Sequence, residues 1–223
     1  TAGDTVGLNF DLTANRTVTI DTTARIVGTL NIGDPTTGYF AYTLAASGGA
    51  TLTFNNNGSG ALLAKPTAAN TVLDVISTPL TLADNLTIDT AVTGTGNSGN
   101  SLQFTGLMTE SGGARTLTKN GVGGMYLNVG GLNNYSGGTI VNAGEIQFSS
   151  SLALGTGTIT MNGGSLAART AARTLTNSMT VGGDFTFNSA NAGGNSLTLT
   201  GNVDLGGATR TILGSMTLPV LMA

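Results

Sequence analysis

The sequence contains no cysteine, no histidine and no tryptophan. Without cysteine, a disulfide framework and thiol chemistry are excluded, and no compartment can be argued from redox state. Without histidine, histidine-based metal sites and nucleophilic triads with a histidine base are excluded as well. From composition we therefore expect no metal site and no cofactor.

Charged side chains are also scarce. They make up 9% of the chain and leave a formal net charge of −3, whereas ordinary globular proteins contain about 25%. Charges this few and scattered argue against nucleic-acid or anionic-lipid partners. No apolar run approaches the roughly 20 residues of a membrane span, so no membrane insertion is expected. Residues 1–4 lack a basic or apolar signal region, so a signal peptide is expected to be absent or already removed.

The chain is instead rich in apolar residues that alternate with threonine. Short segments such as 17–20, 101–104 and 196–200 have this period of two, which is typical of half-buried β-strands. Glycine and asparagine clusters separate them, and both residues tolerate the positive φ of tight corners. The best helix candidate, residues 61–70, is interrupted by a proline. The pattern predicts an all-β protein.

Internal repetition indicates the architecture. The matched stretches are 80–88 with 173–181 and 100–106 with 195–201, within a longer repeat of 80–118 with 173–213. Tandem β-sandwiches and a β-solenoid are both compatible with this. A sandwich has hairpin turns and an aromatic core, but aromatics are only 5% here. We therefore favour a single β-solenoid domain over residues 1–223, with roughly ten coils at ~20–25 residues each.

One stretch carries a more specific motif. Residues 117–148 read LTKNGVGGMYLNVGGLNNYSGGTIVNAGEIQF. They resemble the autotransporter-associated β-strand repeat, with Met125 in place of one leucine, and the best-matching unit extends over residues 115–166. The resemblance implies a right-handed parallel β-helix in the secreted passenger region of a bacterial protein. It also implies an extracellular or cell-surface location.

We expect the motif residues to build coils and corners, with no role in chemistry. Tyr135 is expected to stack on the neighbouring coil or to hydrogen-bond a corner. The structural set is Gly121, Gly123, Leu127, Tyr135, Ser136, Gly137, Gly138, Thr139, Val141, Ala143 and Gly144.

Paired carboxylates need to be checked, because β-helices can carry carbohydrate-cleaving sites. Asp184 and Asp204 would form such a pair if they stacked on adjacent coils, although two unrelated turn acids are the simpler interpretation. Four arginines open similar strands and could line one edge of the rod as a sparse glycan-binding ladder: Arg16, Arg115, Arg173 and Arg210. The simpler interpretation is that their stems cover apolar surface while their charged groups stay in water. We favour the simpler interpretation in both cases, with no catalytic residue and no enzyme.

The predicted function is that of a non-enzymatic extracellular structural protein. It would be a stiff rod that serves as a surface scaffold, an adhesin shaft or the subunit of a head-to-tail filament. Open solenoid ends with unpaired backbone groups and little charge repulsion favour end-to-end self-association. The alternative is a glycan-binding passenger region, which should expose an aromatic platform drawn from Tyr39, Tyr42, Tyr126 and Tyr135. A carbohydrate-cleaving β-helix enzyme is the least favoured interpretation.

Overall fold

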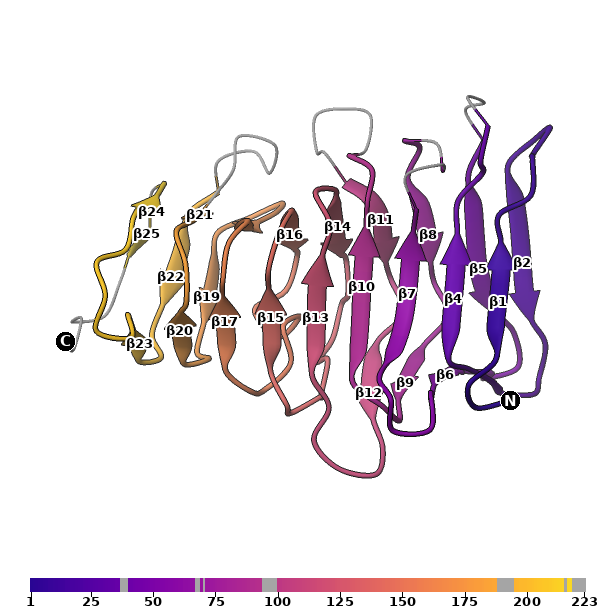
Figure 1. The fold of residues 1–223 in the computed structure, drawn as a ribbon, viewed down its shortest axis with the longest axis horizontal. Helices are drawn as coiled ribbons and strands as arrows, with labels where there is room; N and C mark the ends of the chain where they lie inside the picture. Colours follow the sequence, from indigo (N-terminus) through magenta and orange to yellow (C-terminus); the bar gives the residue numbers. More distant parts are fainter. Residues whose placement is uncertain are drawn as a thin grey trace.

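A computed structural model of the chain describes residues 1–36, 40–66, 69, 71–93, 100–187, 195–214 and 216–217. Over these residues the regular elements are β-strands, which pair in parallel and stack coil upon coil (Figure 1). Within the same residues there is no helix long and apolar enough to cross a membrane. The predicted all-β parallel solenoid is confirmed.

Two long sheets run the length of the solenoid. Sheet A has nine strands: β1 (Thr5–Leu8), β4 (Thr29–Ile32), β7 (Ala61–Lys65), β10 (Leu86–Thr90), β13 (Leu117–Asn120), β15 (Thr139–Val141), β17 (Ile159–Met161), β20 (Met179–Val181) and β23 (Val203–Asp204). Sheet B has nine as well: β2 (Arg16–Ile20), β5 (Tyr42–Ala46), β8 (Asp74–Ile76), β11 (Asn100–Phe104), β14 (Gly124–Leu127), β16 (Glu145–Phe148), β18 (Ser165–Ala168), β21 (Phe185–Phe187) and β24 (Ile212–Leu213).

The third face of the solenoid is divided. Sheet C covers the N-terminal coils with β3 (Arg25–Val27), β6 (Leu52–Phe54), β9 (Leu80–Leu82) and β12 (Met108–Glu110). Sheet D covers the C-terminal coils with β19 (Arg173–Leu175), β22 (Leu197–Leu199) and β25 (Met216–Thr217). The two coils between them have no strand on this face, in segments 128–138 and 149–158, which are described throughout. The predicted motif, residues 117–148, spans these two coils.

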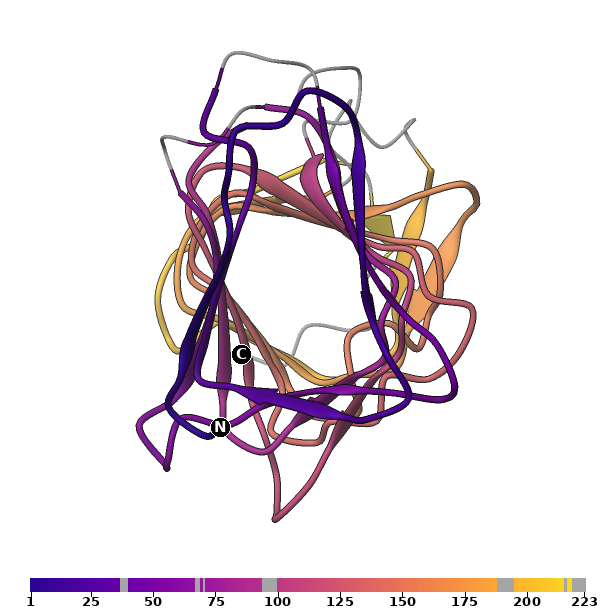
Figure 2. The same ribbon diagram turned by 90° about the vertical axis from the view of Figure 1, so that its right-hand side faces the viewer.

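The coils are superimposed when viewed from the N-terminal end (Figure 2). From there the chain winds clockwise as it recedes, so the solenoid is right-handed as predicted. Nine strands in sheet A make about eight turns, so the expected count of roughly ten coils was too high. Thr29 pairs with Leu62 and Thr87 with Thr118, whereas Thr160 pairs with Thr180. Coils in the N-terminal half are thus longer than the uniform short coils that the estimate assumed.

The internal repeat is only partly a structural repeat. Its first matched stretch places β9 and β19 on the third face, and β10 and β20 in sheet A. Its second stretch places β11 in sheet B but β22 in sheet D, because β21 takes the sheet B position in the later coil. The segment that was the best helix candidate begins with a strand instead: Ala61–Lys65 forms β7, with alternate side chains buried.

The core is a thin column of apolar side chains stacked along the solenoid axis. Along sheet B the register aligns Ile76, Phe104, Leu127, Phe148 and Ala168, all fully buried. Large and smaller side chains alternate in this column, so each coil fills space left by its neighbour. Each buried leucine or phenylalanine contributes about 1.5–3 kcal/mol relative to an exposed one.

Candidate functional site

The motif residues lie in the fifth and sixth coils, where the third face has no strand. Leu127 of β14 and Val141 of β15 are fully buried in the core. Gly121, Gly138 and Gly144 have φ of +74°, +97° and +71°, which only glycine adopts at little cost. Leu127 and Val141 thus lie in strands, and the three glycines lie at corners between strands.

Two further motif glycines, Gly123 and Gly137, lie where backbone segments approach closely. A Cβ at Gly123 would lie 2.0 Å from the carbonyl oxygen of Val92, and one at Gly137 would lie 2.5 Å from the carbonyl carbon of Arg115. Ala143 is half-buried at the corner before β16. All three therefore pack coils against one another.

Tyr135 is fully buried at the centre of the gap. Its hydroxyl lies 2.8 Å from the Thr139 hydroxyl, which donates a 2.9 Å hydrogen bond to the Leu154 carbonyl. Its ring lies against Gly155 of the next coil, where an added Cβ would be 2.5 Å from the ring carbon Cε2. Burial raises the pKa of the Tyr135 hydroxyl. Tyr135 thus makes both of the contacts expected from the motif.

Asn133, which sequence reasoning did not single out, replaces strand pairing across the gap. Its side chain is fully buried. Its Oδ1 accepts a 2.8 Å hydrogen bond from the Met108 amide in β12, and its Nδ2 donates a 2.7 Å bond to the Ala153 carbonyl. One asparagine therefore joins the end of sheet C to the sixth coil.

Glu110 holds the outer corner of the same gap. Its Oε1 accepts from the Ser136 hydroxyl at 2.6 Å, and its Oε2 accepts from the amides of Ser136 and Arg115 at 2.9 and 2.7 Å. Burial acts to raise the pKa of Glu110, but these hydrogen bonds outweigh it, so the pKa lies below its ordinary value. Ser136 of the motif is thus hydrogen-bonded to Glu110 of the preceding coil.

Lys119 occupies an inward-facing core position. It pairs with Ile88 and Val141 on neighbouring strands and is fully buried. Its Nζ donates to the carbonyls of Asn120, Gly121 and Ala143, the last two at 2.9 and 3.4 Å. Burial lowers the pKa of Lys119 to about 7, although the Asp89 carboxylate opposes this shift.

An asparagine ladder runs along the corner that follows sheet A. Asn162 donates from Nδ2 to Asn142 Oδ1 at 2.8 Å, and Asn142 donates likewise to Asn120 at 2.8 Å. Sequence analysis did not single out these asparagines. The spacing of Asn-Gly and Asn-Ala corners by one coil length is the signal that identifies them.

A buried charged cluster lies at the corner between sheets A and B, in the second and third coils. Lys65 Nζ is 2.6 Å from Asp74 Oδ2, and both side chains are fully buried. Asp74 Oδ1 accepts a 2.7 Å hydrogen bond from the Tyr42 amide. Asp34 is also fully buried, and its Oδ2 has no hydrogen-bond partner among the residues that the structure describes. Sequence reasoning missed this cluster because Asp34 and Tyr42 come from the preceding coil, and no local pattern marks Lys65 and Asp74 as buried partners.

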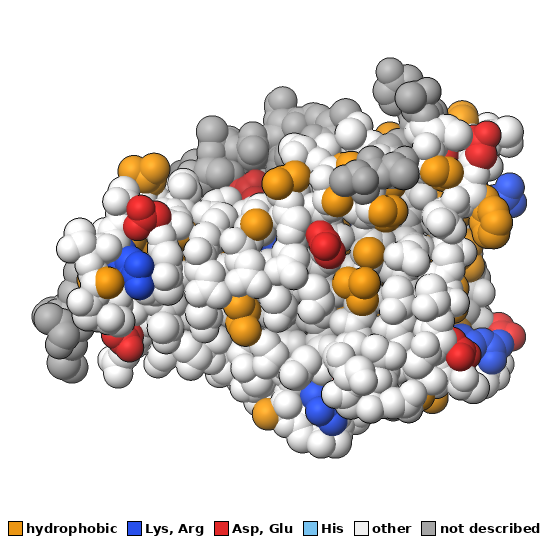
Figure 3. Space-filling view, viewed as in Figure 1, with side chains coloured by type: hydrophobic (Ala, Val, Ile, Leu, Met, Phe, Trp, Pro, Cys, Tyr) orange, Lys and Arg blue, Asp and Glu red, His pale blue; other side chains and the backbone are white. Residues whose placement is uncertain are grey.

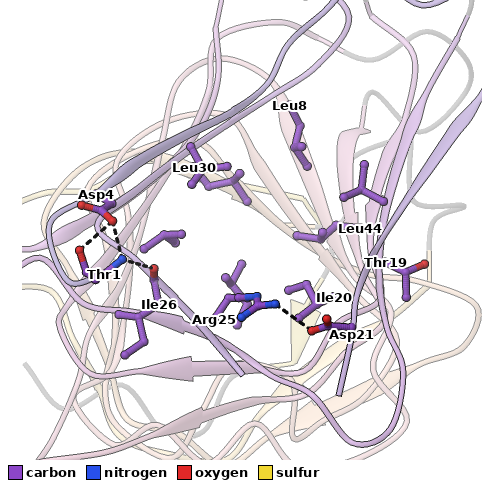
Figure 4. A pocket seen from close by; sticks show the side chains of 14 residues that line it. Thr1, Asp4, Leu8, Thr19, Ile20, Asp21, Arg25, Ile26, Leu30 and Leu44 are labelled. Atoms are coloured by element: carbon purple, nitrogen blue, oxygen red, sulfur yellow. Dashed lines mark hydrogen bonds and ion pairs between the residues drawn. The ribbon is translucent and has the colours of Figure 1, made fainter. Parts of the chain in front are cut away.

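The N-terminal end of the solenoid is open, with a hollow of about 450 Å³ (Figure 4). Its walls are apolar side chains of the first two coils, including Leu8, Ile20, Leu30 and Leu44. Arg25 pairs with Asp21 at 2.9 Å on the rim, and the amino group of Thr1 pairs with Asp4. In the described chain, β1 and β2 each pair on one side only.

The carboxylates considered for catalysis are not stacked. The register places Asp204 opposite Thr180, and not opposite Asp184. Asp204 accepts from the Gly206 amide at 2.8 Å and is a turn acid, whereas Asp184 accepts from the Thr211 amide of the next coil at 2.8 Å. Over the described ranges no group of three or more acidic side chains could hold a metal ion.

The four arginines do not form one ladder. Arg16 begins β2 in sheet B, and Arg173 begins β19 in sheet D. Arg115 precedes β13 in sheet A, and Arg210 precedes β24 in sheet B. Similar sequence context therefore places them on different faces of the solenoid.

The proposed aromatic platform is not present among the tyrosines that the structure describes. Tyr42, Tyr126 and Tyr135 are at most 5% exposed, and Tyr39 lies outside the described residues. The Arg169 guanidinium covers the Tyr126 ring, 4.4 Å from its centroid. The face in Figure 3 shows only scattered charged and apolar side chains between polar groups and backbone.

Comparison of the chain with protein-family models, with curated proteins and with solved structures gives no match.

Proposed function

We propose that this chain is a non-enzymatic structural rod, exposed at or outside a bacterial cell surface. The observation that carries the proposal is the uninterrupted stacking of sheets A and B through nine strands each. Parallel backbone hydrogen bonds connect every coil to the next, so bending the rod would require breaking several sheets at once. A scaffold or adhesin shaft needs this stiffness.

The gap in the third face supports the same role. Side-chain hydrogen bonds from Asn133, Glu110 and Tyr135 hold the coils where no strand is present. The polar groups described in this region are thus engaged in joining coils. The extracellular location is supported by the resemblance of residues 117–148 to a passenger-region repeat.

The shape is tested by small-angle scattering and electron microscopy of the purified chain. At about 4.8 Å per coil, eight turns predict a rod section roughly 40 Å long, with constant cross-section. A flexible or spherical particle would contradict the proposal. The location is tested by protease treatment of intact cells that express the full-length protein. Digestion from outside is expected, and recovery from the cytoplasm alone would contradict it.

We further propose that the open N-terminal end stacks on the C-terminal end of a second copy. Its apolar hollow would then be covered by another coil, and β1 and β2 would gain the second partners that they lack in the described chain. Sheets A and B both reach the last coil through β23 and β24, so a second copy could continue both sheets in the same parallel sense. The scarcity of charge leaves little repulsion against this contact.

Matched valine substitutions test this assembly by sedimentation. Val6 lines the open end and is 38% exposed, whereas Val122 is 68% exposed on the corner between β13 and β14. Val6→Asp should abolish concentration-dependent association, and Val122→Asp should leave it unchanged. A wild-type chain that stays monomeric at high concentration, or equal effects of both variants, would count against stacking.

A further inference from the structure

The sequence contains two lysines, and both are fully buried. Lys119 donates to backbone carbonyls, but Lys65 faces a carboxylate. Its Nζ lies 2.6 Å from Asp74 Oδ2, so the carboxyl carbon of Asp74 is one bond beyond the contact. An amine and a carboxyl group held this close, away from water, have the geometry of reactants that need no further approach.

The surroundings hold both groups in place. Lys65 Nζ also donates to the carbonyls of Val72 and Ser101. Asp74 Oδ1 accepts from the Tyr42 amide at 2.7 Å. Gly33 of the second coil lies beside the pair, since a Cβ there would be 3.4 Å from Lys65 Cε and 3.5 Å from Asp74 Oδ2, which is ordinary van der Waals contact.

A second carboxyl group completes the cluster. Asp34 follows Gly33 and is fully buried. Its Oδ1 accepts from the amide and hydroxyl of Thr36, while its Oδ2 has no partner within the described part of the chain. Its charge acts on both Lys65 and Asp74. Two buried carboxylates and one ammonium leave an excess negative charge in the interior, which is costly in a protein core.

We propose that Lys65 and Asp74 condense to an intramolecular amide bond between Nζ and Cγ, formed by the folded chain itself. The Nζ lone pair attacks Cγ, the Cγ–Oδ2 bond breaks, and one water molecule leaves. The proton lost by Nζ passes to Oδ2, which already carries the acid proton and leaves as water, and the charge of Asp34 favours the positive charge that develops on Nζ during the attack. The Tyr42 amide stabilises the negative charge that develops on Oδ1. The reaction needs no oxidant and no other co-reactant.

The protonation states agree with this geometry. Burial lowers the pKa of Lys65 and raises the pKa of Asp74, although their mutual attraction opposes both shifts. Burial thus disfavours the charged form of each group, and the neutral amine and the neutral acid are the forms that condense. The bond would lock sheet A to sheet B across one corner of the third coil. The inference does not depend on where the protein is located or on what it binds.

The mass of the purified full chain decides the matter. Measured after denaturation, it should be lower than the sequence mass by one water molecule. Fragmentation of the peptide that contains both residues should give no separated products from backbone cleavage between residues 65 and 74. A full sequence mass, or a deficit that maps elsewhere in the chain, would overturn the proposal.

Amine labelling of the denatured chain is an independent readout. The amino terminus and Lys119 should react, and Lys65 should not. Complete labelling of Lys65 would show that no amide bond joins Lys65 to Asp74. This measurement requires no variant, so it does not depend on how well a substituted chain folds.

Variants then assign the roles. Lys65→Met should restore the full mass, whereas Lys119→Met, the matched change at the other buried lysine, should keep the deficit. Asp74→Asn should release ammonia in place of water. Asp34→Asn should slow bond formation about 10²-fold, the range for loss of one charge-stabilising group, because it removes the negative charge that favours the positive charge developing on Nζ. Rapid and complete condensation in Asp34→Asn would remove Asp34 from the mechanism.

Discussion

The side chain of Asn133 pairs with the backbone of Met108 as a neighbouring strand would. The amide of Met108 donates to Asn133 Oδ1 at 2.8 Å, and the carbonyl of Met108 accepts from the amide of Asn134 at 3.1 Å. In a sheet both bonds would come from main chain. Here the side chain supplies one of them and also reaches the Ala153 carbonyl. The loss of a strand is therefore compensated by one residue.

Asn133→Ala should destabilise the solenoid by roughly 2–4 kcal/mol, because it leaves a buried donor and a buried acceptor unpaired. Asn134→Ala is the control, because the Asn134 side chain is exposed and only its backbone bonds Met108. It should change stability by less than about 0.5 kcal/mol. Denaturant unfolding measures both variants. Similar losses in the two would show that Asn133 does not bridge the gap.

Two glycines in this region should respond very differently to alanine. Gly155 has a φ of +69° and leaves only 2.5 Å between an added Cβ and the Tyr135 ring. The left-handed backbone alone costs about 1–3 kcal/mol for a residue with a Cβ, so Gly155→Ala should lower the free energy of unfolding by at least that amount. Gly130 has no atom within 4 Å of an added Cβ, so Gly130→Ala should be neutral or stabilise slightly. Thermal and denaturant unfolding of both variants would reveal the contrast, and equal stabilities would refute it.

The all-β class, the parallel stacking and the use of glycine corners could be predicted, because each leaves a local pattern in the sequence. Alternation at residues 52–54 and 197–199 requires no knowledge of distant residues. The coil count could not be predicted with the same accuracy, since corner length varies along the chain. The lengths of those corners decide which strands pair. Part of the later copy of the internal repeat, strand β22, therefore lies on a different face from its counterpart β11.

The buried cluster was harder still to predict. Lys65 continues the inward alternation of Ala61 and Leu63, but a lysine at the end of a strand usually suggests solvent. Only the three-dimensional register shows that its amine meets Asp74, with Asp34 supplied by the preceding coil. Asn133 has the same difficulty, because its partners come from the coils on either side.

Glu110 should give the solenoid a measurable acid sensitivity. Its folded pKa lies below its ordinary value, so its contribution to stability is complete above the unfolded pKa of about 4.3. The contribution is lost as the pH falls through the folded pKa. The difference in unfolding free energy between wild type and Glu110→Gln should therefore be constant near neutral pH and shrink below about pH 4.3. Ser136→Ala keeps the Glu110 carboxylate, so its free energy of unfolding should depend on pH more than that of Glu110→Gln does. A wild-type to Glu110→Gln difference that stays constant down to pH 2 would contradict the assignment.

Lys119 should give a second pH dependence of the same sign, on the alkaline side. Its folded pKa of about 7 lies below the value of about 10.4 for an unfolded lysine. Between these two values the unfolded chain binds more protons than the folded chain, so stability must rise with pH. For this one group the slope reaches at most ~1.4 kcal/mol per pH unit. Below pH 7 the folded protein carries the full penalty of a buried ammonium.

Lys119→Met removes this titration and keeps a side chain of similar length. The wild type should gain stability relative to this variant as the pH rises from 7 to 10. Chemical denaturation at a series of pH values across that range measures the free energy of unfolding of both proteins. The difference between the two free energies should shift in favour of the wild type at each higher pH. Lys119→Arg provides the matched control, because an arginine stays charged throughout and should be destabilised at every pH. If wild type and Lys119→Met showed parallel pH profiles, the Lys119 amine would have to be solvated in the folded chain, and its place in the core column would be wrong.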